Sequence, residues 1–85
     1  MNISRGEQRV LHVLAQGGRI VHERSSRTRF SRVECFTRDG FLLCDCTLEV
    51  FAKLRRKHLI ESRAGGPYGI SRRGRDAVRP QPDNR

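Results

Sequence analysis

The three cysteines of this 85-residue chain are candidates for metal binding or disulfide formation because of their residue type and spacing. Cys44 and Cys46 are separated by one residue, and Cys35 precedes both. A structural zinc site usually takes two Cys-x-x-Cys pairs, which this spacing does not supply. An odd number of cysteines also argues against a secreted disulfide scaffold. We therefore expect reduced thiols in the core of a cytoplasmic protein, with no bound metal.

The histidines are the other candidates for catalysis. His12, His22 and His58 fall in three different predicted elements, and none has an obvious nucleophile or carboxylate partner. The run Gly65-Gly66-Pro67 lacks the Lys-Ser/Thr that follows a phosphate-binding loop, so it predicts a turn. Without a catalytic constellation we expect a protein that is not an enzyme and needs no cofactor.

Binding chemistry is the stronger signal, because Lys and Arg outnumber Asp and Glu by 18 to 9 and give a formal net charge of +9. This charge favours an acidic partner, either nucleic acid or an acidic protein face. Arginine dominates, which suits bidentate recognition of phosphate or carboxylate, although GC-rich codon usage would give the same skew. The candidate partner-binding or nucleic-acid-binding residues are Lys53, Arg55, Arg56, Lys57, Arg63, Arg72 and Arg73.

A helix followed by a β-hairpin would position these cations. Thr47 can cap the helix, and the cations near its end would also complement the helix dipole. Its apolar arc is Leu48, Val50, Phe51 and Leu54. The residues after it read as a strand from Leu59-Ile60, a turn at Gly65-Gly66-Pro67, a strand at Tyr68-Gly69-Ile70 and a last helix capped by Ser71. This order is typical of the second half of a winged helix.

The first half of the chain lacks the expected support helix. Ser4 to Glu7 matches a capping box and predicts a helix near residues 5–16, which Gly17-Gly18 ends. Residues 19–44 read as strands, where a helix-turn-helix would have a second helix. We therefore predict an α+β fold, a winged-helix-like single domain over residues 1–78 with the order α-β-β-β-α-β-β-α and a β-hairpin in place of the second helix. An extended C-terminal tail follows over residues 79–85.

Asp39-Gly40 predicts a two-residue type I′ turn that places Cys35 opposite Cys44. At a non-hydrogen-bonded position the two Cα atoms would be about 4.5 Å apart, close to disulfide geometry, but core thiols suit a reducing compartment better. The expected core face carries Val33, Cys35, Leu42 and Cys44. The opposite face leaves an exposed apolar patch of Phe36, Phe41 and Leu43. That patch indicates either a partner-binding surface or a misassigned register.

We recognise no targeting signal and no membrane-spanning segment in the sequence. No apolar run approaches the roughly 18 to 20 residues that span a bilayer, and the N-terminus lacks the apolar core of a signal peptide. We expect a cytoplasmic protein without a membrane partner.

Several blocks of sequence resemble the YjhX toxin family, in order and over nearly the whole chain. They are Asn2-Ile3-Ser4-Arg5, Glu7-Gln8-Arg9, Leu11-His12-Val13-Leu14-Ala15, Gly17-Gly18-Arg19-Ile20, Asp45-Cys46-Thr47-Leu48, Ala77-Val78-Arg79 and Gln81-Pro82-Asp83-Asn84-Arg85. The resemblance implies the toxin of a bacterial toxin–antitoxin pair, an acetyltransferase-like antitoxin as partner, and inhibition of DNA topoisomerase I. None of the blocks is a catalytic motif, so the resemblance gives no side chain a role.

The sequence therefore leaves two candidate functions for this chain. The first is a non-catalytic inhibitor that binds DNA topoisomerase I with its basic residues. The second is a winged-helix transcriptional regulator that binds DNA, whose affinity for bare duplex would fall steeply with salt.

Overall fold

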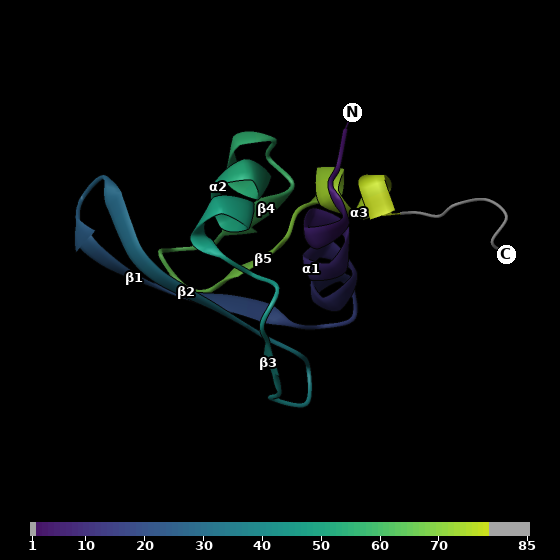
Figure 1. Ribbon diagram of the computed structural model, residues 1–85, viewed down its shortest axis with the longest axis horizontal. Helices are drawn as coiled ribbons and strands as arrows, with labels where there is room; N and C mark the ends of the chain where they lie inside the picture. The colour runs from purple at the N-terminus through teal and green to yellow at the C-terminus, as the bar shows by residue number, and fades with distance from the viewer. Residues whose placement is uncertain (1, 79–85) are drawn as a thin grey trace, which may run out of the picture.

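The structure is a computed structural model that describes residues 2–78, and these residues form three helices and five strands (Figure 1). The elements are α1 (Arg5–Ala15), β1 (Arg19–Ser26), β2 (Arg29–Phe36), β3 (Leu42–Leu43), α2 (Leu48–Arg56), β4 (Ile60–Ser62), β5 (Tyr68–Ile70) and α3 (Arg72–Val78). The α+β class and the predicted order of elements are confirmed. The predicted tail, residues 79–85, lies outside the described residues. No helix within residues 2–78 is long and apolar enough to cross a bilayer.

The strands form one antiparallel sheet in the order β3-β2-β1-β5-β4. Figure 1 shows the three helices on one side of the β1–β2 ribbon. Ile20 is central, since it pairs with Cys35 on β2 and with Tyr68 on β5, and all three side chains are buried in the core. Residues 21–34 of the β1–β2 hairpin pair only with each other, and we call this segment the arm.

The start of α1 is held by the predicted capping box. Ser4 Oγ accepts a hydrogen bond from the Glu7 N–H at 3.2 Å, and the Glu7 carboxylate accepts one from the Ser4 N–H at 2.8 Å. These two bonds satisfy backbone donors that a helix start leaves without partners. The helix then buries Val10, Leu11 and Leu14 against the sheet and the other helices.

Thr47 caps α2 as predicted, because its Oγ1 accepts a hydrogen bond from the Val50 N–H at 3.1 Å. Phe51 and Leu54 are buried, as the apolar arc requires. Leu48 is different from the prediction, since it remains 44% exposed. It occupies the first position of the helix, about 60° around the axis from Phe51 and 120° from Leu54, which turns its side chain away from the core.

The predicted turn between β2 and β3 is wrong by one residue. Cys35 pairs with Leu43 and Phe36 with Leu42, and with a hydrogen bond between Thr37 and Phe41 three residues, 38–40, remain in the loop rather than two. Thr37 closes it, because its N–H donates to the Phe41 carbonyl and its Oγ1 accepts from the Phe41 N–H. Gly40 has a φ of +94°, and a three-residue loop needs this conformation at one position only. The Asp39-Gly40 pair is compatible with both a two-residue and a three-residue loop.

The one-residue shift exchanges the faces of β3 and therefore the cysteine partners. Cys44 is exposed, whereas Cys35 and Cys46 are both buried and their thiols are in contact. The predicted pairing of Cys35 with Cys44 is therefore wrong, and all three cysteines are free thiols. The hydrogen bond with Cys35 and, second, burial raise the pKa of the Cys46 thiol, which keeps it protonated.

Candidate partner-binding surface

The arm contains a β-bulge that changes the direction of its side chains. Glu23 pairs with Arg32, but the next residue on β1, Arg24, pairs with Phe30, so Ser31 is left between two pairs. An extra residue in one strand reverses the face of the residues beyond it. Phe30 consequently points to the helix side, where its ring packs on Phe51 with centroids 4.9 Å apart and an interplanar angle of 75°.

Two arginines from different elements stack on Phe30. The guanidinium carbon of Arg24, from β1, lies 4.5 Å from the ring centroid, and that of Arg55, from α2, lies 4.7 Å from it. Arg24 also donates a hydrogen bond of 2.6 Å to the Arg27 carbonyl oxygen. A guanidinium that is already stacked loses less side-chain entropy when its remaining N–H groups bind a carboxylate or a phosphate.

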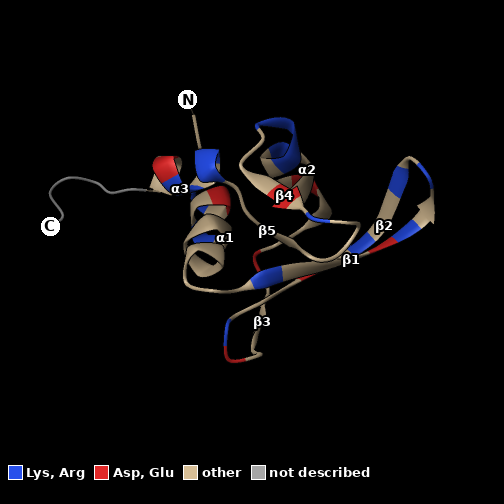
Figure 2. Ribbon diagram, turned by 180° about the vertical axis from the view of Figure 1, so that it is seen from behind, with Lys and Arg blue, Asp and Glu red and all other residues tan. Residues whose placement is uncertain are grey.

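The end of α2 carries further cations, which face the N-terminal segment. Arg56 is exposed, and Lys53 lies 3.7 Å from Glu49 in a weak, exposed pair. Figure 2 shows basic segments on the arm and at the end of α2. We call a set of exposed or half-buried cations of the arm and of α2 the basic surface. It consists of Arg24, Arg27, Arg29, Lys53, Arg55 and Arg56.

Lys57 is half-buried and paired within the fold instead. Its Nζ donates to both carboxylate oxygens of Glu7, at 2.9 and 3.1 Å, and to the Asn2 carbonyl oxygen at 2.6 Å. The Glu7 side chain is only 2% exposed, so this ion pair ties α2 to the start of α1. Lys57 was predicted among the partner-binding cations, but its ammonium group is already bonded to Glu7 and Asn2, so the basic surface is defined without it.

The environment of Glu7 explains how a buried carboxylate stays ionised. Burial is the largest single influence and would raise its pKa. Hydrogen bonds from the Ser4 backbone, from Lys57 and from the Ser4 hydroxyl, together with the Lys57 charge, outweigh burial and lower the pKa of Glu7 below its ordinary value of 4.5.

The other predicted cations lie farther along the chain. Arg63 is exposed in the turn between β4 and β5, and Arg72 and Arg73 are exposed at the start of α3. Ser71 holds that start against the residues that follow α2, because its Oγ donates to the His58 carbonyl at 2.7 Å and accepts from the Gly74 N–H at 3.0 Å.

The predicted apolar patch is divided by the corrected register. Phe41 is 71% exposed at the β2–β3 loop, and Phe36 is half-buried beneath the Arg19 guanidinium at 5.3 Å. Leu43 instead packs against the core, and Leu42, 53% exposed, takes its place beside Phe36. Phe36 and Phe41 therefore retain exposed surface, whereas Leu43 does not belong to the patch.

Sequence reasoning missed Arg24 and Phe30, the centre of the basic surface. The bulge left a signal, because strict alternation back from the half-buried Val33 would turn the small Ser31 inward and the large Phe30 outward. Because an outward-facing Phe next to an inward-facing Ser is unfavourable, the pattern indicates a β-bulge. The described residues contain no group of three or more His, Cys, Asp or Glu that could hold a metal ion.

Comparison with known proteins assigns the chain to a family. The YjhX_toxin family profile, described as "Putative toxin of bacterial toxin-antitoxin pair", matches residues 1–85. The chain belongs to this family, which confirms the resemblance noted from the sequence, and a toxin–antitoxin family implies an antitoxin partner.

Relatives named UPF0386 protein match over almost their whole length. The one from Beijerinckia indica is 67% identical and the one from a Ruegeria species 60% identical, each over the whole of both chains. The one from Rhodospirillum rubrum is 63% identical over 99% of this chain and 93% of the relative. No solved structure matches the chain.

Proposed function

We propose that this chain acts as the toxin of its pair by binding DNA topoisomerase I through the basic surface, with no chemical step of its own. The observation that carries the proposal is the stacking of Arg24 and Arg55 on Phe30. It holds two guanidinium groups from two elements at one place. The choice of topoisomerase as target comes from the family resemblance.

A topoisomerase at work holds DNA, so an approaching cation meets phosphates as well as any acidic protein surface around them. Long-range attraction accelerates the encounter with a chain of net charge +9. The stacked arginines then provide planar donors for short-range contacts, which are the contacts that slow dissociation.

The test is relaxation of supercoiled plasmid by purified topoisomerase I, with capture of the enzyme on the immobilised chain after nuclease treatment. Arg55→Ala should raise the concentration for half inhibition about tenfold or more, as for a central interface arginine. Arg38→Ala is the matched control, because it removes the same charge from the β2–β3 loop and should change that concentration less than about twofold. Loss of all captured enzyme after nuclease treatment would contradict direct binding.

A DNA-binding regulator is the second candidate, and one observation favours it. α2 is followed directly by the β4–β5 hairpin, with Arg63 in the turn, so a helix and a wing are adjacent. The sequence-independent part of such binding is electrostatic. Anisotropy of a labelled duplex should then show affinity falling with salt, with a log–log slope near −0.9 for each phosphate contact. Affinity without that slope would argue against this function.

A further inference from the structure

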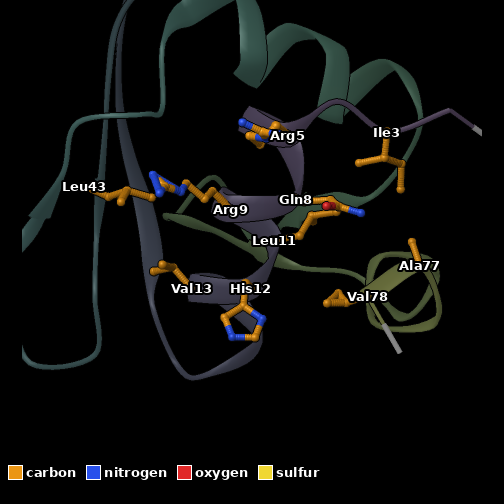
Figure 3. A pocket seen from close by; sticks show the side chains of 10 residues that line it. All are labelled: Ile3, Arg5, Gln8, Arg9, Leu11, His12, Val13, Leu43, Ala77 and Val78. Atoms are coloured by element: carbon orange, nitrogen blue, oxygen red, sulfur yellow. The ribbon is translucent and has the colours of Figure 1, made fainter. Parts of the chain in front are cut away.

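A groove of about 630 Å³ runs along the exposed side of α1, and the basic surface does not contribute to it (Figure 3). Its apolar lining comes from the N-terminal segment, α1, β3 and α3. The residues are Ile3, Leu11, Val13, Leu43, Ala77 and Val78. All except Leu11 are only partly buried by the described chain. The groove therefore offers apolar surface that a partner could cover.

The rim of the groove is cationic. Arg5, Arg9 and His12 lie at helical spacing on the exposed side of α1, and none of the described residues that line the groove is Asp or Glu. Arg9 contacts Asp45 at 2.6 Å, with the two side chains 62% and 38% exposed. A pair this exposed contributes about 1 kcal/mol at most, so a partner carboxylate could replace Asp45.

We propose that this groove binds an amphipathic helix of the antitoxin, with apolar side chains between Leu43 and the Ala77–Val78 side and carboxylates along Arg5, Arg9 and His12. The proposal rests on the proposed function only in taking the chain as the toxin half of a pair. A helix suits the site because residues spaced at i, i+4 and i+7 on α1 match acidic residues at the same spacing on a parallel or antiparallel neighbour.

The charge and the apolar lining of the groove favour the antitoxin helix over two other possible occupants. A second copy of the chain would place the same cations against one another across a two-fold axis, and the repulsion would oppose association. Nucleic acid would satisfy the rim but would leave the apolar lining without a complementary surface. An acidic amphipathic helix satisfies both parts of the groove.

The test uses the full-length chain and purified antitoxin, with affinity measured by calorimetry. Ala77→Glu places a carboxylate in the lining, and His12→Glu places one at the rim, where the side chain is exposed. Each should weaken antitoxin binding about tenfold or more. Ala15→Glu is the control, because this exposed residue of the same helix does not line the groove. It should change affinity less than about twofold.

The two proposals fail in different ways. If Ala77→Glu and His12→Glu bind antitoxin as well as Ala15→Glu does, the groove proposal is wrong, whatever the chain does to topoisomerase. If both groove variants lose antitoxin but the unaltered chain never inhibits topoisomerase, the groove proposal stands and the proposed target falls. Inhibition retained by Ala77→Glu but lost in Arg55→Ala would support the proposed function and show that inhibition does not need the groove.

Other occupants would also be recognised. Dimeric unaltered chain that becomes monomeric in His12→Glu would assign the groove to a second copy. Nuclear Overhauser contacts between residues 79–85 and the Val13 methyl groups in the free chain would assign it to the C-terminal segment. Either result would overturn the assignment to the antitoxin.

Discussion

At the scale of single residues, the Glu7–Lys57 pair shows that a cation next to candidate partner-binding residues can instead stabilise the fold. Lys57 stands next to Arg55 and Arg56 in the sequence, yet its ammonium group faces a carboxylate that is 2% exposed. Removing one member of such a pair leaves the other without compensation, which costs more than the pair itself contributes.

Glu7→Gln should therefore destabilise the protein by about 2 kcal/mol, below the range for fully buried pairs because Lys57 retains some solvent contact. In a chain of this size that loss lowers the Tm by roughly 10 °C. Thermal unfolding followed by circular dichroism measures it. Glu49→Gln is the control, since Glu49 is 79% exposed in its pair with Lys53, and its Tm should stay nearly unchanged. Equal Tm values for the two variants would contradict the structural role of Glu7.

The same carboxylate predicts a pH dependence. Its pKa is lower in the folded chain than its ordinary value of 4.5, so the unfolded chain binds the proton more readily. The stability that Glu7 contributes is complete above that ordinary value and is lost as pH falls through the folded pKa. Urea unfolding between pH 6 and pH 2 should show a steeper loss of stability for the unaltered chain than for Glu7→Gln. Parallel curves would be inconsistent with this pKa shift.

The corrected β2–β3 register predicts the reactivity of the thiols. Cys44 is exposed, while Cys35 and Cys46 are buried and in contact, so one thiol should react quickly with a thiol reagent and two only after unfolding. Mass spectrometry after brief alkylation should locate the label on Cys44. Slow labelling of Cys44 in the folded chain would restore the register expected from the sequence, which places Cys44 on the core face.

At the scale of elements, the helices were predictable because their signals are local. Ser4 and Thr47 carry capping oxygens within three residues of the donors they satisfy. Strand register is decided by distant packing instead, and Asp39-Gly40 was compatible with two loop lengths. The basic surface was predicted only in part for the same reason, since the bulge at Ser31 and the burial of Lys57 both depend on contacts with other elements.

The packing of α3 gives a prediction at this scale. A Cβ on Gly74 would overlap the carbonyl oxygen of Leu59, so Gly74 allows α3 to approach the chain just before β4. Gly74→Ala should lower the free energy of unfolding by about 2 kcal/mol or more, because backbone must move. Gly69→Ala, in β5, meets no atom within 4 Å and should have a much smaller effect. Chemical denaturation of both variants measures the difference, and similar midpoints would argue against this close approach.

At the scale of the whole molecule, the chain presents two surfaces with different chemistry. The basic surface combines arginines of the arm and α2, whereas the groove combines apolar side chains with a cationic rim on α1. Partners should therefore respond differently to salt, because screening weakens exposed charge contacts more than apolar burial.

We expect binding at the basic surface to weaken as NaCl rises from 50 to 200 mM, and antitoxin binding at the groove to weaken less. If phosphates are among the contacts, Arg55→Ala should make the log–log salt slope shallower by about one unit. Arg38→Ala should leave the slope unchanged. Calorimetry of the two partners over the same salt series measures this, and identical slopes for both partners would count against two chemically distinct surfaces.

The position of the groove also limits where a reporter can be attached without blocking a partner. Ile3 lines it and is the third residue of the sequence, so an affinity tag or fluorescent protein fused at the N-terminus would be attached close to the groove. Such a fusion could block a partner that the unfused chain accepts. The turn around Ala64 and Gly65 is the better place for an inserted label, because both residues are exposed and the turn does not line the groove.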